Sequence, residues 1–492
     1  MRALAIALFA TTALLGACSD DDDDGSGNNG GTSGGGSSPT AGQKADGGAA
    51  GQMGNNEAGE TAAGAGGTNG AAARKFTVTL ENVAPVKLFT SSGVFNTPTG
   101  DAAPGPATPG KSYEFTIHAG RKQKLSFATM LAATNDLFYA PNGDGIALYD
   151  EDGEPLSGDV TDQVYLWDAG TEVNEEPKVG PNTVSKQAAP NTGPVEGGNV
   201  QLIEDTEDTF EYPAVSEVLS VEVMHVSGTE FKVMISNVST DTALHTSDGD
   251  FAAPISPGTW VVHGGANPLF TPGMPDRSQG IESIAEDGNP STLGAFAAAT
   301  SGVTFPASPG VWAVHAAGEM PLFVNGDADF GDGLEHIAED GNPALLGEEL
   351  ATVDALSAAV FNMPVGSATP GPITPGKKYQ FSFEAAPGQS LSFATMLAAT
   401  NDVFFGPADV GIPLFDEDGE PIDGDITGEV LLWDTGTEAN EEPAIGPNTV
   451  TNQPAPDTGE AGEGKVQPLS EVDDSYSYPA VDELLKVTIS VE

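Results

Sequence analysis

The chain has 492 residues, with 17 lysines and arginines against 72 aspartates and glutamates, which gives a net charge of −55. This balance excludes nucleic acid as a general partner, because binding phosphates needs clustered basic side chains. A single cysteine excludes an intrachain disulfide, and the length allows two to four domains.

The N-terminus has the pattern of a signal peptide. Arg2 precedes an apolar run over residues 4–15, and Leu15-Gly16-Ala17-Cys18 closes it. This ending resembles the bacterial lipoprotein signal, in which the chain is cleaved before the cysteine and the cysteine is lipidated. We therefore predict a signal peptide over 1–18 and a membrane anchor on Cys18. By the same resemblance, Ser19 favours the outer membrane, and the acidic run from Asp20 to Asp24 resembles the tethers of lipoproteins displayed at the cell surface. The alternative is an ordinary signal peptide with an incidental cysteine.

Residues 19–74 begin with an acidic run and continue as glycine, serine, alanine, asparagine and threonine. Such a segment holds too few large apolar side chains to offset the entropy of ordering it. We predict a disordered acidic and glycine-rich linker that ends where folded sequence begins.

Strands are the main element that the remaining sequence predicts. Residues 76–83 alternate apolar and polar side chains, which is the pattern of a half-buried strand. Similar short stretches, bounded by glycine, proline, asparagine or aspartate, lie at 112–119, 124–130, 145–150, 163–167, 218–223 and 231–238. Helix signals are nearly absent from this part of the chain. The predicted fold class is all-β, with antiparallel β-sandwich domains.

The sequence is duplicated. Trp167-Asp168 recurs as Trp433-Asp434, an offset of 433 − 167 = 266, and this offset relates residues 94–221 to 360–487 without a gap. The strand at 76–83 instead matches 231–238, at an offset of 231 − 76 = 155. The second copy would then carry 266 − 155 = 111 more residues than the first, between the strand at 231–238 and the repeat that begins at residue 360. We predict domains at 75–227 and 228–492, the second with an insertion at about 239–359.

A smaller tandem repeat lies inside this insertion. Ser256-Pro257-Gly258 recurs as Ser308-Pro309-Gly310, and an Ile-Ala-Glu-Asp-Gly-Asn-Pro run recurs at 284–290 and 337–343. Each unit predicts a strand, a loop, a short helix, a Gly-Asn-Pro break and a second short helix. The insertion is a candidate binding surface.

The Trp-Asp loop is the strongest candidate site. Asp168 falls at the end of a predicted strand, Gly170 lets the backbone turn, and Glu172 follows four residues after Asp168. Asp136 follows another predicted strand. Carboxylates gathered at one end of a sandwich repel one another unless a cation joins them, and calcium accepts six to eight oxygens in loose geometry. The alternative is a solvated acidic loop with Trp167 as a core residue.

These motifs resemble a spondin domain, the module near the N-terminus of F-spondin-type matrix proteins that also occurs in bacterial secreted proteins. The resemblance rests on residues 126–130, 134–136 and 166–172 and on their second copies. It implies an antiparallel β-sandwich with one bound calcium (Ca2+). The implied ligands are Asp136, Asp168 and Glu172 in the first copy and Asp402, Asp434 and Glu438 in the second. Glu172 and Glu438 depart from the aspartate that the family has there.

Two further motifs have both a structural and a chemical interpretation. The acidic run at 150–155 resembles part of a calcium loop, but it lacks the EF-hand spacing and lies between two predicted strands, which favours a hairpin turn. His263 and His315 occupy the same place in the tandem units, near Glu286 or Glu339 in the repeat. They could form an acid–base or metal site, although a structural histidine at a strand end is the stronger interpretation.

The sequence thus favours a lipid-anchored surface protein that uses two calcium-binding sandwiches to bind or adhere to an extracellular protein or glycan. It favours no enzymatic activity. Two alternatives stay open. One is a carboxylate-dependent hydrolase of surface glycans, and the other is a purely structural surface protein whose acids only solvate it.

Overall fold

The computed structural model describes residues 73–353 and 356–492. The predicted signal peptide at 1–18, its Cys18 and nearly all of the predicted linker at 19–74 lie outside these residues. Within the described part of the chain, no helix is both long and apolar enough to cross a membrane.

The all-β prediction is confirmed, because two sandwiches of antiparallel sheets form the folded chain. In the first sandwich a four-stranded sheet has the order β3 (Ser112–His118), β11 (Glu230–Asn237), β10 (Leu219–Ser227) and β7 (Gly158–Asp159). Its seven-stranded sheet runs β2 (Ser91–Phe95), β14 (Ile255–His263), β4 (Lys124–Leu131), β5 (Leu137–Pro141), β8 (Val164–Asp168) and β9 (Gln201–Leu202), with β6 (Ile146–Ala147) paired to β4. A separate hairpin joins β12 (Leu244–Thr246) and β13 (Gly249–Phe251).

The second sandwich repeats this plan. Its four-stranded sheet has the order β17 (Lys378–Ala385), β1 (Arg74–Asn82), β24 (Leu485–Val491) and β21 (Gly424–Asp425). Its seven-stranded sheet runs β16 (Ser357–Phe361), β15 (Ala307–Ala316), β18 (Gln389–Leu397), β19 (Val403–Pro407), β22 (Val430–Asp434) and β23 (Gln467–Pro468), with β20 (Ile412–Pro413) paired to β18.

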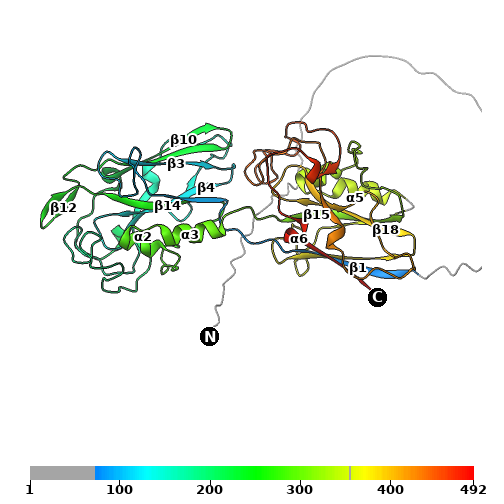
Figure 1. Cartoon of the computed structure of the whole chain (residues 1–492), viewed down its shortest axis with the longest axis horizontal. Helices are drawn as coiled ribbons and strands as arrows, with labels where there is room; N and C mark the ends of the chain where they lie inside the picture. The colour runs from blue at the N-terminus through cyan, green and yellow to red at the C-terminus, as the bar shows by residue number, and fades with distance from the viewer. Residues whose placement is uncertain (1–72, 354–355) are drawn as a thin grey trace, which may run out of the picture. The chain divides into compact units, whose positions relative to one another are not determined.

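Each seven-stranded sheet buries both of its faces. In β4, Leu125 and Phe127 face the four-stranded sheet, whereas Ala128 and Met130 belong to a second core cluster with Trp167. This second cluster includes side chains from α2 (Ile281–Asp287) and α3 (Ser291–Thr300), which lie along the sheet on the side away from β3 and β10 (Figure 1). A strand with both faces buried carries apolar residues at consecutive positions, as β4 does.

The helix pairs form where the tandem units predict them. Gly288 ends α2 with a left-handed φ of 64°, and its N–H bonds to Ile284 O at 2.9 Å. Pro290 then precedes α3, because its fixed φ suits the first turn of a helix. Helices α4 (Leu334–Asp340) and α5 (Ala344–Ala351) repeat this arrangement in the second sandwich. Two single-turn helices, α1 (Val215–Val218) and α6 (Val481–Leu484), precede β10 and β24.

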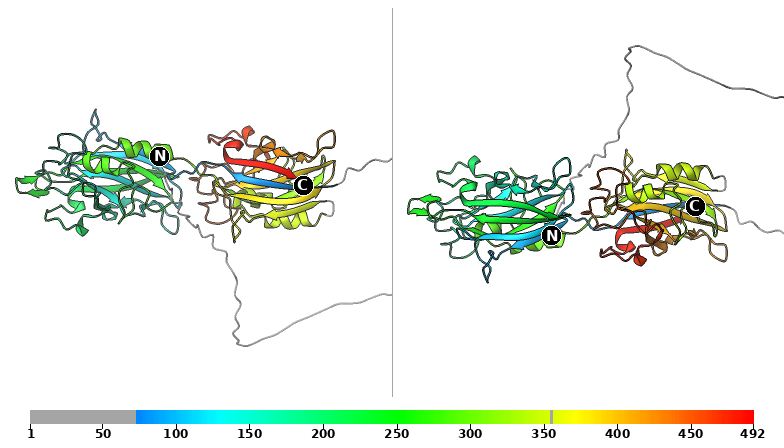
Figure 2. Two further views of the ribbon diagram at one scale, coloured as in Figure 1. Left: turned by 90° about the horizontal axis from the view of Figure 1, so that it is seen from below. Right: turned by 90° about the horizontal axis from the view of Figure 1, so that it is seen from above.

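The strand pairing crosses the predicted domain division. Strand β1 lies between β17 and β24 of the second sandwich, although the division at 75–227 and 228–492 puts it in the first domain (Figure 2). Strand β11 fills the same place in the first sandwich, between β3 and β10. The predicted insertion at 239–359 is also shared, because β14, α2 and α3 join the first sandwich and β15, α4 and α5 the second. Two strands with the same alternation fit either position, so the pattern could not assign them.

Candidate metal centre

Two strand ends of the first sandwich bring Asp136 and Asp168 together. Asp136 directly precedes β5, whose first residue pairs with Asp168, the last residue of β8. Because antiparallel partners lie about 5 Å apart, this register sets the two carboxylates side by side at one end of the sheet. Both residues are fully buried.

The turn after Asp168 brings a third acid to the same place. Gly170 has a φ of 68° and donates its N–H to Asp168 Oδ1 at 2.6 Å. A Cβ at Gly170 would lie 2.7 Å from Asn199 O, so only glycine allows this approach of the two backbones. Backbone bonds from Gly198 N to Gly170 O and from Glu196 N to Thr171 O then hold Glu196 beside the turn.

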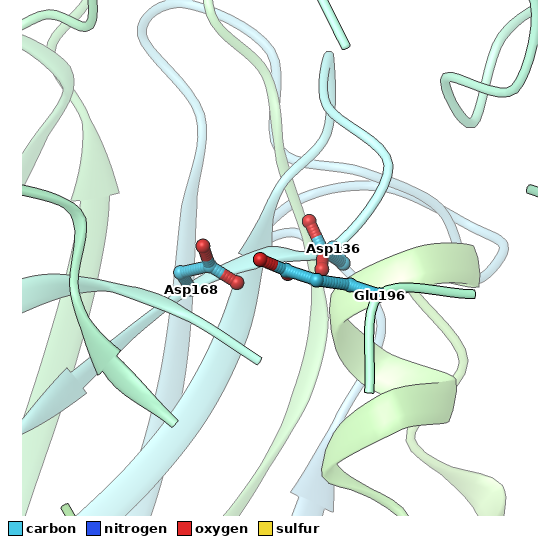
Figure 3. A group of neighbouring side chains, drawn as sticks. All are labelled: Asp136, Asp168 and Glu196. Carbon is cyan, nitrogen blue, oxygen red and sulfur yellow. The ribbon is translucent and has the colours of Figure 1, made fainter. Parts of the chain in front are cut away.

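The three acids form a cluster with the geometry of a cation site. Asp136, Asp168 and Glu196 each offer one carboxylate oxygen, and these oxygens all lie within 4.8 Å of one another. Figure 3 shows the three side chains pointing toward one another. Glu196 is exposed and the two aspartates are buried, so the cluster has one open side. Asp136 Oδ1 is buried without a hydrogen-bond partner.

The electrostatics of the cluster are uniformly negative. Burial, followed by the charge of Asp168, holds the pKa of Asp136 well above its ordinary value. Burial also raises the pKa of Asp168, and the pKa of Glu196 rises through burial and then through the charge of Asp168. Every charged neighbour that contributes to these shifts is another carboxylate. A bound cation would remove this cost of gathering the acids.

Glu172, the third ligand that the sequence predicts, lies next to this cluster but is engaged otherwise. Its carboxylate accepts hydrogen bonds from Gly193 N at 2.6 Å and from Asn135 Nδ2 at 3.4 Å. Its own N–H donates to Asp136 Oδ2 at 3.1 Å. The backbone N–H of Glu172 thus orients Asp136, whereas the third carboxylate that converges with those of Asp136 and Asp168 is that of Glu196. Sequence reasoning missed Glu196 because it sought acids that recur in both copies, and the matching position is Gly462.

The second sandwich keeps the two aspartates but not the third acid. Gly436 N donates to Asp434 Oδ1 at 2.6 Å, and Glu438 N donates to Asp402 Oδ2 at 3.2 Å, as in the first copy. Asp402 Oδ1 is also buried without a partner, and the carboxylate of Glu438 accepts from Gly459 N. A Cβ at Gly462 would lie 2.4 Å from Glu438 O, so the backbone leaves no room there for a side chain.

A second acidic cluster joins two residues of α4 in the second sandwich to Asp457, which lies in a loop. Glu335, Glu339 and Asp457 each place one carboxylate oxygen within 4.8 Å of the other two. Glu339 is buried and accepts a hydrogen bond from Thr437 Oγ1 at 2.6 Å. In the first sandwich the position of Asp457 is Asn191, whose amide donates to Glu282 Oε1 at 2.7 Å. The described residues thus contain two acidic clusters that can hold a metal ion, one in each sandwich and at different places.

The two histidines of the tandem units have structural roles. The ring nitrogens of His263 lie 2.9 Å from Ser126 Oγ and 2.6 Å from Gly265 O, and burial lowers the pKa of the ring to about 4. His315 has the equivalent contacts with Ser392 Oγ and Ala316 O. Both nitrogens of each ring are therefore engaged by groups other than a carboxylate.

The acidic run at 150–155 forms a turn, as the sequence favoured. Asp150 Oδ1 accepts hydrogen bonds from Asp152 N at 3.0 Å and from Glu154 N at 2.9 Å. A bridge between Tyr149 and Pro155 closes it. This side chain thus stabilises its own loop, which is a common role of aspartate in turns.

Comparison with known families finds no family model that matches the chain, and the comparison with curated proteins finds no match. The spondin resemblance therefore stays a prediction from the sequence, and the six predicted ligands are judged on their geometry alone.

Proposed function

We propose that the chain is a calcium-binding surface protein, and that Asp136, Asp168 and Glu196 bind the ion in the first sandwich. Two observations carry this proposal: three carboxylate oxygens converge within 4.8 Å of one another, and one oxygen of Asp136 is buried without a hydrogen-bond partner. Burying two carboxylates without a counter-charge is costly, and such groups are normally paired or bound to metal. A divalent cation supplies the missing charge.

The donor set favours calcium among the common metal ions. All three ligands are carboxylate oxygens, whereas zinc prefers cysteine and histidine. Magnesium needs a near-ideal octahedron at about 2.1 Å, while calcium accepts irregular oxygen sites at about 2.3–2.6 Å. A site built from two strand ends and a loop suits the more tolerant ion, and water can complete the shell on the open side.

We propose that calcium stiffens the loops at this end of the sandwich, so that they present a fixed surface to an extracellular protein or glycan. The sequence of the N-terminus supports a place at the cell surface, since it predicts a lipid anchor on Cys18 followed by a long glycine-rich linker. In the second sandwich, Asp402 and Asp434 have no third acid among the described residues converging on them, so we expect weaker binding at that place.

Calorimetric titration of the calcium-free chain with calcium tests this function. We expect heat from binding in the millimolar to sub-millimolar range that is typical of extracellular modules. The Asp168→Asn variant should lose the stronger binding event, while Asp434→Asn, the matched change in the second sandwich, should keep it. Absence of heat, together with an unfolding temperature that a chelator leaves unchanged, would contradict the proposal.

A further inference from the structure

Strands β1 and β11 are interchangeable in their buried faces. Phe76, Val78 and Leu80 of β1 are fully buried, and Phe231, Val233 and Ile235 of β11 hold the same positions in the first sandwich. These strands therefore present nearly the same apolar surface, which differs by a single leucine for isoleucine.

The last residue of each strand also makes the same hydrogen bonds. Asn82 Nδ2 donates to Phe305 O at 2.8 Å and to Ile373 O at 3.0 Å. Asn237 Nδ2 donates to Ala107 O at 2.8 Å and to Ala253 O at 2.9 Å. The two sandwiches thus have equivalent slots between two strands, and each slot recognises the same apolar and amide pattern.

The two strands differ in how the chain connects them to their slots. β11 follows β10 through a two-residue turn, Gly228-Thr229, so its place beside β10 is fixed locally. β1 has no such connection, because its partners β17 and β24 lie about 300 and 410 residues further along the sequence. The entire first sandwich is inserted between β1 and the rest of its own sheet.

We propose that β1 is an exchangeable strand, and that a second copy of this chain can supply it to the second sandwich. The slot between β17 and β24 must be filled, because without β1 the apolar side chains that line it and the edges of both neighbouring strands would face water. No covalent feature requires that the filling strand come from the same chain. Reciprocal exchange joins two chains, and open-ended exchange joins many.

Exchange between chains depends on concentration. A tethered strand has an effective concentration of about a millimolar for its own slot, so in dilute solution β1 fills the slot of its own chain. Proteins anchored on one membrane can be crowded to a similar concentration. Under those conditions some slots hold β1 of the same chain and others hold β1 of a neighbouring chain. Strand exchange involves no residue of the cation site, so it can occur or fail to occur independently of the proposed calcium binding.

The register of β1 supplies the test. Thr77 lies directly opposite Ser382 of β17, with their hydroxyl oxygens 2.8 Å apart. In full-length chains carrying Cys18→Ser, one population would carry only Thr77→Cys and the other only Ser382→Cys. The two populations are mixed, unfolded, refolded together at about 1 µM and about 1 mM, and oxidised. A disulfide between the two populations forms efficiently only where β1 of one chain lies in the slot of another.

The first sandwich provides a matched control. Lys232 lies opposite Thr116 in the β11–β3 pair, at the position equivalent to Thr77 and Ser382. Mixed Lys232→Cys and Thr116→Cys chains should form only the few disulfides that random collisions give, because the turn holds β11 beside β10 of its own chain. We expect the Thr77→Cys and Ser382→Cys mixture to give several-fold more heterodimer than this control at the higher concentration, and no excess at the lower one.

Two results would overturn the proposal. One is a heterodimer yield equal to the control at both concentrations, which would show that β1 returns only to its own chain. The other concerns a single chain carrying Thr77→Cys and Ser382→Cys together. If that chain forms no internal disulfide when refolded dilute, β1 does not occupy this slot.

Discussion

The Asp136→Asn variant should have opposite effects in the absence and presence of calcium. The carboxylate oxygens of Asp136 and Asp168 lie within 4.8 Å, and two unit charges at that separation repel by about 3.5 kcal/mol at an effective dielectric constant of about 20. The substituted asparagine would keep the shape of the side chain and an oxygen to accept the N–H of Glu172. The raised pKa of Asp136 means that this side chain is partly protonated in the wild type, which already relieves part of the repulsion. We therefore expect the free energy of unfolding of calcium-free Asp136→Asn to exceed that of the wild type by about 1–3 kcal/mol.

Calcium should no longer stabilise the folded protein in the same variant. A ligand at about 100 times its dissociation constant stabilises a folded protein by about 2.7 kcal/mol, so the wild type should gain this amount and Asp136→Asn should gain almost none. Thermal unfolding with chelator and with calcium measures both effects, at about 2–4 °C per kcal/mol for a folded unit of this size. Asp402→Asn is the matched control in the second sandwich. A calcium-free Asp136→Asn protein that is less stable than the wild type, or that calcium still stabilises fully, would refute the reasoning.

Three further outcomes follow from the structure. Glu196→Gln should weaken calcium binding by about tenfold or more, equivalent to about 1.4 kcal/mol. Glu463→Gln should not, because that carboxylate bonds to Lys465 and Gln467; calorimetric titration compares the two. Burial raises the pKa values of Glu286 and Glu339 from 4.5 to about 8, so the stability that these two groups contribute to the calcium-free protein is fully present below pH 4.5 and is lost as the pH rises toward 8. The urea midpoints at pH 5 and pH 9 should differ less in Glu286→Gln than in the wild type. An unchanged difference would exclude Glu286 as a cause of this pH dependence. Asn82→Ala should destabilise the second sandwich by about 2–4 kcal/mol, because three buried partners lose their bonds, and Asn237→Ala should do the same to the first. Scanning calorimetry separates the two transitions, and equal loss in both transitions from one variant would contradict the assignment of each strand to its own sandwich.

Local patterns carried most of the fold prediction. Alternation located β1 and β11 to within two residues, and the Gly-Asn-Pro breaks located the ends of α2 and α4. These signals succeed because they reflect backbone constraints that act over a few residues. The duplication likewise fixed the equivalence of the two seven-stranded sheets.

The pairing of β1 could not be predicted from such patterns. An amphipathic strand shows which side chains are buried, but not which of two equivalent slots buries them. Because Phe76 and Phe231 hold equivalent positions in the two slots, only the three-dimensional arrangement assigns each strand.

The candidate site was predicted in part for a related reason. Asp136 and Asp168 lie at strand ends, where the register of the sheet determines their approach. Glu196 reaches the site from a loop almost 30 residues later, through the close contact of Gly170 with Asn199. Because the second copy has Gly462 at this position, the repeat gave no signal for it. Contacts between loops depend on backbone approach, which a sequence pattern does not encode.

A crystal structure grown in calcium tests the central claim most directly. We expect one ion in the first sandwich with Asp136, Asp168 and Glu196 each contributing an oxygen at about 2.3–2.6 Å, together with water on the open side. Electron density that places calcium elsewhere, or that shows the three carboxylates converged without an ion at millimolar calcium, would contradict the account.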